Sequence, residues 1–148
     1  MKTYKSTVDE YKLTKKSTNF NRAKITSSTN AATFARQFYY EDIEIYESFF
    51  LVLLNQASNT VGYVKISQGG TAGTVVDVAL IAKYAVESLS RSVILVHNHP
   101  SGNLKPSDAD KSITKRTKAA LELFSIKVLD HIILTTDGYF SFSDEGLM

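Results

Sequence analysis

The amino-acid sequence predicts a mixed α/β fold in which a central mixed β-sheet is flanked by helices. Two observations carry this prediction. Apolar segments that suit buried strands alternate with segments whose apolar residues recur at helical spacing. The predicted order is helix, two strands, helix, strand, helix and two strands. At 148 residues, 43% of them hydrophobic, the chain is most simply one globular domain.

The first 27 residues are polar and weakly patterned, and we expect them to form a partly ordered N-terminal extension. Val8, Tyr11 and Leu13 are the residues of a short candidate strand. The segment is locally basic, which is more typical of a solvated terminus than of a nucleic-acid contact. The folded domain is expected to span residues 28–148.

The first half of this domain is predicted to hold a helix and a hairpin. A helix at residues 30–39 follows a Ser-Ser-Thr run that suits its capping. The segment EIYESFFLVLLNQ (44–56) favours a buried strand, and TVGYVKIS (60–67) favours a second one that pairs with it antiparallel. The GGTAG loop (69–73) is expected to be flexible, and it lacks the ending of a phosphate-binding loop.

The second half begins with a helix that Asp77 opens. Its apolar stripe is predicted to consist of Val78, Ile81, Ala82, Ala85, Val86 and Leu89. SVILVH (92–97) is then a central strand covered on both faces, and Pro100 ends it. A helix is predicted at 107–124, and the last two strands at 126–136 and 138–143 are joined by a Thr-Asp-Gly turn.

Two histidines at the end of the central strand predict a metal site. Side chains alternate along a strand, so His97 and His99 share one face while Asn98 points away. Asp110, in the first turn of the following helix, is the natural third ligand. Zinc favours nitrogen ligands, and a catalytic site needs only three protein ligands. Thiolate ligands are excluded, because the chain has no cysteine.

Each of these residues also has a plainer interpretation. Ser107 and Asp110 form a Ser-x-x-Asp pattern that resembles a capping box. His131, in a strand pattern, is more typical of a hydrogen-bonded structural histidine than of a ligand. A hydrolytic metal site further needs a base, and the candidates are Glu44 and Glu47, both at the start of the buried strand. Glu47 directly precedes the apolar run, where a carboxylate needs a partner.

The overall composition narrows the class of protein. A net charge of +2 is too small to indicate a nucleic-acid-binding protein. The N-terminus has no apolar stretch that would suit a signal peptide, and no run approaches the ~18 apolar residues of a membrane span. We therefore expect a cytoplasmic protein without a membrane partner. The sequence leaves the oligomeric state open, with a homodimer as one option.

These motifs resemble a known family. His97-Asn98-His99-Pro100 with Ser107 and Asp110 is similar to the JAMM (MPN-type) signature H-x-H-P-x6-S-x-x-D. The segments HNHPSG (97–102), PSDAD (106–110) and DHII (130–133) resemble its RadC-like branch more closely. The resemblance covers about residues 28–148. It implies the JAMM/MPN fold, a cytidine-deaminase-like sandwich, in the short bacterial form that lacks an N-terminal helix-hairpin-helix region.

The resemblance also implies roles for the site residues. His97, His99 and Asp110 would bind Zn2+, Glu47 would act as the general acid/base, and Ser107 would donate a hydrogen bond to the developing oxyanion. The function expected from it is a zinc-dependent metallopeptidase or isopeptidase that uses a metal-activated water. The alternatives are a DNA-repair or recombination-associated protein, to which the family label and the basic start of the chain point, and a non-catalytic binding module.

Overall fold

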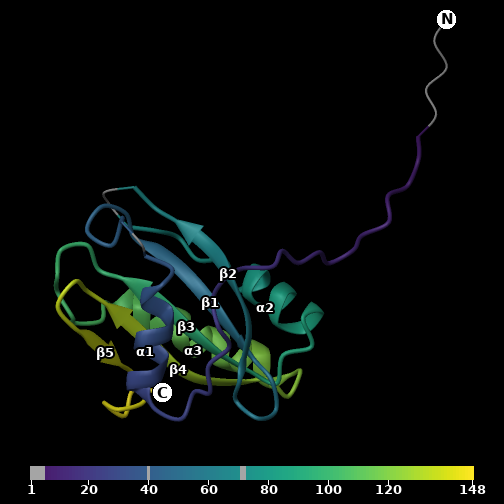
Figure 1. Cartoon of the computed structure of the whole chain (residues 1–148). Helices are drawn as coiled ribbons and strands as arrows, with labels where there is room; N and C mark the ends of the chain where they lie inside the picture. Colours follow the sequence, from purple (N-terminus) through teal and green to yellow (C-terminus); the bar gives the residue numbers. More distant parts are fainter. Residues whose placement is uncertain (1–5, 40, 71–72) are drawn as a thin grey trace, which may run out of the picture.

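The computed structural model describes residues 6–39, 41–70 and 73–148. Its described residues form five strands in one mixed sheet and three helices (Figure 1). The helices are α1 (Ser28–Arg36), α2 (Val78–Glu87) and α3 (Asp108–Glu122). The strands are β1 (Ser48–Leu54), β2 (Thr60–Gln68), β3 (Ser92–Asn98), β4 (Lys127–Leu134) and β5 (Tyr139–Ser141). The predicted fold class and order of elements are confirmed.

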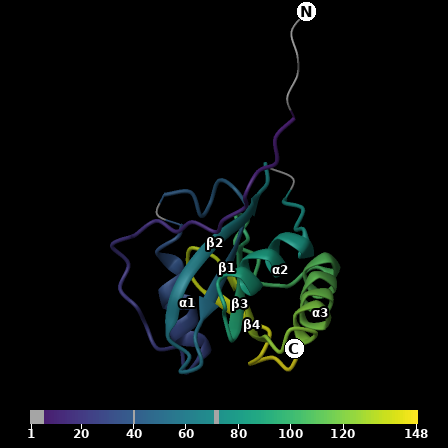
Figure 2. The same cartoon turned by 90° about the vertical axis from the view of Figure 1, so that its right-hand side faces the viewer.

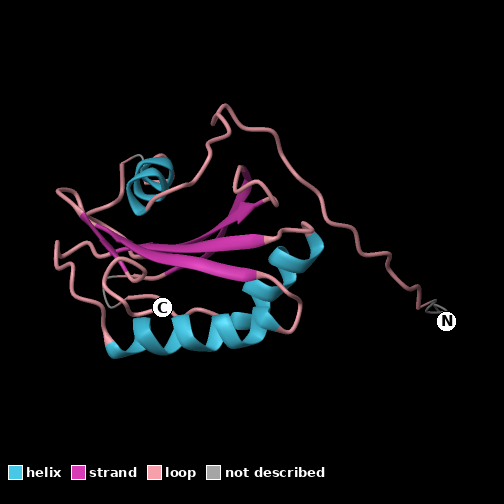
Figure 3. Ribbon diagram, turned by 90° about the horizontal axis from the view of Figure 1, so that it is seen from below, coloured by secondary structure: helices cyan, strands magenta, loops and turns pink. Residues whose placement is uncertain are grey.

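The sheet is the middle layer of a sandwich, with α1 on one face and α2 and α3 on the other (Figure 3). Every residue of β1 and β3 is buried, as expected for strands covered on both faces. Each face of the sheet has its own hydrophobic core, and alternate residues of β1 contribute to the two cores. Phe50 and Val52 pack on the side of α1, whereas Phe49 and Leu51 pack on the side of α2 and α3.

The strand order β2-β1-β3-β4-β5 makes β1 and β3 neighbours inside the sheet, and three chain segments meet at one end of these two strands. β1 pairs antiparallel with β3, and Phe49 lies opposite His97, so the start of β1 meets the end of β3. β3 and β4 are parallel, and α3 connects them. The N-terminus of α3 therefore lies near the end of β3, and α2 lies beside α3 (Figure 2).

Two predictions about individual segments are wrong. The candidate strand with Val8 and Tyr11 does not form, and these side chains are 98% and 94% exposed. The predicted stripe of α2 is too long, because the helix ends at Glu87; Leu89 follows with a φ of 57° and is 84% exposed. Residues 71–72 of the loop expected to be flexible lie outside the described residues.

Smaller differences concern the ends of the helices and the surface of the chain. α1 begins at Ser28, two residues before the predicted start, because the Ser27 side chain accepts a hydrogen bond from the backbone N–H of Asn30. Asp77 and Ser107 cap α2 and α3 in the same way. Among the described residues, none of the helices has the length and apolar character that a bilayer span requires.

Candidate metal centre

β3 delivers the two histidines to the same side of the sheet. The Nε2 atoms of His97 and His99 lie 3.0 Å apart. His97 is buried against the ring of Phe49, with which it stacks, and the His99 side chain is 13% exposed. Asn98, between them, is buried with its side chain among the backbone of residues 43–48. The predicted alternation of these three side chains is confirmed.

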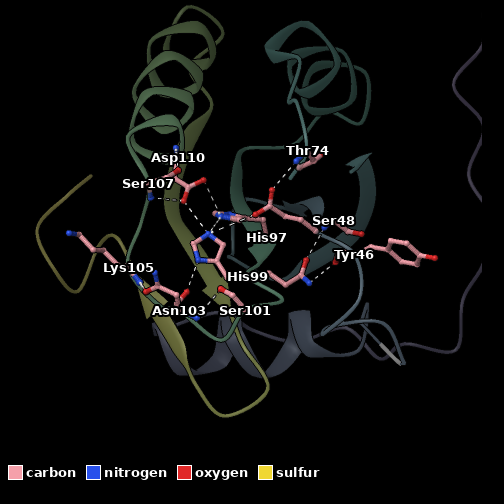
Figure 4. A network of polar contacts seen from close by, with 12 residues as sticks. Tyr46, Ser48, Thr74, His97, His99, Ser101, Asn103, Lys105, Ser107 and Asp110 are labelled. Atoms are coloured by element: carbon pink, nitrogen blue, oxygen red, sulfur yellow. Dashed lines mark hydrogen bonds and ion pairs between the residues drawn. The ribbon is translucent and has the colours of Figure 1, made fainter. Parts of the chain in front are cut away.

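Asp110 reaches the same point from the first turn of α3. Its Oδ1 lies 3.2 Å from Nε2 of His97, and its Oδ2 lies 3.2 Å from Nε2 of His99. Burial alone would raise the pKa of the Asp110 carboxyl, but hydrogen bonds with His97 and His99 hold that pKa well below its ordinary value. The carboxylate is therefore ionised and directed at the two imidazoles (Figure 4).

The capping interpretation of Ser107 and Asp110 is confirmed as well. The Asp110 carboxylate accepts a hydrogen bond from the Ser107 backbone N–H, at 2.8 Å, and the Ser107 hydroxyl accepts one from the Asp110 backbone N–H, at 3.0 Å. This reciprocal pair is a capping box. It fixes the carboxylate at the start of α3 while leaving one oxygen lone pair for each histidine. One residue thus serves both the helix and the site.

Glu47 is the residue just before β1, and its side chain points into the site. Extending the β1–β3 register from Phe49 opposite His97 places Glu47 opposite His99. Its Oε1 lies 3.9 Å from Nε2 of His99, and its Oε2 accepts a hydrogen bond from the backbone N–H of Thr74 at 2.9 Å. Glu47, His97 and His99 offer ligand atoms that all lie within 4.8 Å of one another, which is compatible with a metal ion.

Glu44, the other candidate base, is not part of this group. Its side chain is exposed and accepts a hydrogen bond from the Thr136 hydroxyl, at 2.9 Å. The chain forms a turn at residues 41–45, and of the two glutamates only Glu47 lies beside a site histidine. Of the two candidate bases that the sequence offered, the structure brings Glu47, the one that the resemblance implied, beside the histidines.

Asn98 holds Glu47 and its neighbours in position, a role that the sequence did not predict. The Asn98 amide donates hydrogen bonds to the carbonyls of Ile43 and Tyr46, both at 2.7 Å, and its oxygen accepts one from the Ser48 N–H at 2.8 Å. Asn98 thereby holds both sides of Glu47 to the end of β3. The available signal was an amide in a buried strand, where each polar atom needs a partner.

The far nitrogen of each histidine is also occupied. Nδ1 of His99 donates to the Asn103 carbonyl at 2.6 Å. Burial opposes the charged form of His99, but hydrogen bonds with Asp110 and Asn103 raise its pKa above the ordinary value. Nδ1 of His97 lies 2.7 Å from Nε2 of His131, which is fully buried. The prediction that His131 is a hydrogen-bonded structural histidine is confirmed.

Two hollows open beside Glu47, one on each side of the site. The first, of about 250 Å³, lies between the Thr74–Val76 segment and α3, where Ile113 and Arg116 line it. The second, of about 510 Å³, lies between Ile45, Gly70 and the segment His99–Ser101. Glu47 lines both hollows, and His97 and Asp110 line the first of them.

The fold is that of an α/β domain with a helix-flanked mixed sheet, and the histidine and carboxylate side chains at the end of its central strand are compatible with a metal ion. Comparison with known families identifies the family to which this domain belongs. The model of the RadC-like JAB domain family matches residues 25–147. The chain therefore belongs to the RadC-like JAB domain family, as its resemblance to that family predicted.

The curated relatives are proteins named UPF0758. One from Flavobacterium johnsoniae is 45% identical over 84% of this chain and 53% of its own length. One from Porphyromonas gingivalis is 43% identical over 69% of this chain and 45% of its own. UPF0758 protein YfjY of Escherichia coli is 38% identical over 69% of this chain and 64% of its own. The chain thus spans about half the length of most of these relatives.

Proposed function

We propose that the protein is a zinc-dependent hydrolase that cleaves a peptide or isopeptide bond. The observation that carries the proposal is the convergence of two imidazole nitrogens and one carboxylate, with a second carboxylate just outside them. Three protein ligands with an open position are typical of a catalytic zinc site. Membership in the RadC-like JAB domain family supports the same reaction class.

The distances between the donor atoms support a bound metal ion of the size of zinc. A tetrahedral zinc ion with bonds of about 2.0–2.1 Å has ligand atoms about 3.3 Å apart. Nε2 of His97 lies 3.0 Å from Nε2 of His99 and 3.2 Å from Oδ1 of Asp110, and Nε2 of His99 lies 3.2 Å from the other oxygen, Oδ2. The Glu47 oxygen lies farther away, at 3.9 Å from Nε2 of His99. We therefore assign His97, His99 and Asp110 as ligands and Glu47 as the base.

When bound, the zinc ion supplies Lewis acidity, which makes water a better nucleophile near neutral pH and stabilises negative charge on a carbonyl oxygen. The Glu47 carboxylate takes a proton from the attacking water and then delivers it to the leaving nitrogen. The Thr74 N–H holds one oxygen of Glu47 and leaves the other, Oε1, directed at the histidines. Both proton transfers therefore use an oxygen with a fixed position.

Ser107 is suited to stabilise the oxyanion while it still caps α3. Its hydroxyl oxygen accepts a hydrogen bond from the Asp110 N–H, and the hydroxyl hydrogen remains available to donate. The side chain is exposed at the edge of the site, where a substrate carbonyl can approach it. A donor that stabilises such an oxyanion contributes about 10²–10³-fold to the rate of acyl transfer in known cases.

The test is the substitution Glu47→Gln, with zinc content and hydrolysis measured on the same samples. Hydrolysis would be followed with a library of fluorogenic peptides and Lys-linked isopeptides. We expect the variant to retain about one zinc ion per chain and to lose hydrolysis by about 10²–10⁴-fold, the usual contribution of a general acid/base. Glu44→Gln is the matched control, because Glu44 lies three residues away and outside the metal group.

Four outcomes would contradict the proposal. A purified protein without stoichiometric zinc would remove its basis, and undiminished hydrolysis by Glu47→Gln would remove the base. An equal loss in Glu44→Gln would show that the effect is not specific to the site. A protein that binds zinc and cleaves nothing in the library would instead favour a non-catalytic binding module.

A further inference from the structure

His97 reaches α3 through a continuous chain of hydrogen bonds. Nδ1 of His97 lies 2.7 Å from Nε2 of His131, and Nδ1 of His131 lies 2.6 Å from the Thr114 hydroxyl. That hydroxyl lies 2.7 Å from the backbone carbonyl of Asp110, one turn earlier in α3. The chain therefore starts at the backbone of one proposed ligand and ends on the side chain of another. We call these four residues the α3–His97 relay.

The direction of every hydrogen bond in the relay follows from its first member. A carbonyl oxygen only accepts, so the single hydroxyl hydrogen of Thr114 is donated to Asp110. The Thr114 oxygen must then accept from His131, which places the ring proton of neutral His131 on Nδ1. Nε2 of His131 is left as an acceptor, so Nδ1 of His97 must be the donor. A neutral His97 consequently has its free lone pair on Nε2, facing Asp110 and His99.

We infer that Thr114 and His131 are positioning residues that hold His97 in the tautomer required for metal binding. The inference deepens the proposed function, on whose ligand set it rests. His99 needs no such relay, because its Nδ1 donates directly to the Asn103 carbonyl. His97 is buried in the sheet beside Phe49, where a second imidazole takes the place of that carbonyl.

The surroundings of His131 support a fixed, neutral acceptor. The ring is fully buried and stacks on Phe142 at 4.6 Å between ring centroids, with Phe49 edge-on at 5.6 Å. A charged imidazolium would be costly in this buried position between two aromatic rings, so the packing favours the neutral ring. Ligating histidines in general gain orientation from a hydrogen bond on their far nitrogen, and its loss reduces metal affinity about 10–100-fold.

The test is Thr114→Val, which replaces the hydroxyl by a methyl group of similar volume. We expect the affinity for Zn2+, measured by competition with a chromophoric chelator, to fall about 10–100-fold. Long-range 1H–15N correlation on histidine-labelled, zinc-free protein above neutral pH should show the His131 proton on Nδ1 in the wild type and on Nε2, or exchanging, in the variant. Thr114→Ser, which restores the hydroxyl, should recover both the affinity and the tautomer.

Thr117→Val is a matched control on the same helix. Thr117 is also fully buried, but its hydroxyl has no hydrogen-bond partner among the described residues. This substitution makes the same chemical change outside the relay, and it should leave the zinc affinity and the His131 tautomer unchanged. Thermal unfolding of the zinc-free proteins would show that each variant is folded.

The possible results separate the relay from the proposed function. Wild-type zinc affinity in a folded Thr114→Val protein, a wild-type His131 proton on Nε2, or an equal loss of affinity in Thr117→Val would each overturn the relay. None of these measurements uses hydrolysis. A protein that binds zinc without cleaving any substrate would therefore refute the proposed hydrolase and leave the relay standing.

Discussion

Asn98 shows how one buried side chain can position a residue from a distant part of the chain. Its amide satisfies the carbonyls of Ile43 and Tyr46 and the N–H of Ser48, and so it holds the chain on both sides of Glu47. In Asn98→Ala these backbone groups would lose their partner, at about 1–3 kcal/mol for a buried group left unsatisfied. We expect the free energy of unfolding in urea to fall by at least about 2 kcal/mol and any hydrolysis to fall with it.

Asn55→Ala provides the comparison for that prediction. Asn55 also accepts two backbone hydrogen bonds, from Ala57 and Asn59, but it lies in the turn between β1 and β2 at the other end of the strand. This variant should lose less stability, because the freed groups are close to water, and it should keep its hydrolysis. Equal effects of the two substitutions on hydrolysis would show that Asn98 does not position Glu47.

Asp130 gives a prediction about pH. It is buried in β4 and accepts hydrogen bonds from the Ser141 hydroxyl, at 2.6 Å, and from the N–H groups of His131 and Ser143. Burial outweighs these hydrogen bonds and raises its pKa above the ordinary value of 3.8. The folded state therefore binds a proton more tightly than the unfolded state, and the stability from this group is present at low pH and lost as pH rises through the raised pKa.

The measurement is urea denaturation of the metal-free protein across that range, compared with Asp130→Asn, which cannot titrate. The stability of the wild type relative to the variant should increase as the pH falls through the raised pKa and level off below the ordinary value of 3.8. A wild type that loses stability relative to the variant on acidification would show that the three hydrogen bonds dominate over burial.

At the scale of the element, the strands and helices could be predicted because their patterns are local. The apolar run of β1 indicated a buried strand, that of β3 indicated burial on both faces, and the alternation along β3 separated His97 and His99 from Asn98. The proximity of Glu47 could not be predicted from its neighbours alone. It depends on the antiparallel register of β1 with β3, in which Phe49 lies opposite His97.

The hydrogen-bond partners of the buried polar groups could not be predicted from the sequence either, because they also depend on tertiary structure. Asn98 is bonded to a segment about fifty residues away, and the Thr114 hydroxyl meets His131 from a different element. Such contacts follow from tertiary packing and leave no periodic signal. The exposed Leu89 was misassigned because apolar spacing continued beyond the point where the backbone of α2 had left the helix.

The loop after β2 contains a second set of hydrogen bonds that hold Glu47, in addition to those of Asn98. The Gly69 N–H donates to the Glu47 carbonyl at 2.8 Å, and the Thr74 N–H donates to its side chain. A Cβ on Gly69 would lie 1.7 Å from the Gly73 carbonyl oxygen, so Gly69→Ala must displace this loop. We expect that variant to keep zinc affinity within about threefold of wild type and to lose hydrolysis by more than about tenfold, because it disturbs the base and not the ligands.

Gly70→Ala is the adjacent control, since a Cβ there would meet nothing within 4 Å. It should retain both zinc affinity and hydrolysis. If Gly69→Ala retained full hydrolysis, the loop would have no part in placing Glu47. If it lost zinc as readily as hydrolysis, the effect would extend to the whole metal centre.

At the scale of the whole molecule, the structure bears on where the folded domain begins. Residues 6–19 are exposed, whereas residues 20–25 lie against the β1–β2 hairpin. The Phe20 ring lies 5.6 Å from that of Tyr63, the Thr60 N–H donates to the Ala23 carbonyl at 2.8 Å, and Ile25 is 8% exposed. These contacts place the last part of the predicted N-terminal extension on the domain core.

A pair of truncations tests the boundary predicted at residue 28. Removing residues 1–17 deletes only exposed chain among the described residues, and it should leave the thermal midpoint within about 2 °C of the full chain. Removing residues 1–27 also deletes the Phe20 and Ile25 contacts. Burial of one such side chain contributes about 1.5–3 kcal/mol, and each kcal/mol shifts the midpoint of a domain of this size by about 2–4 °C. We therefore expect scanning calorimetry to show a drop of more than about 5 °C for the longer truncation; equal midpoints would place the boundary at residue 28 after all.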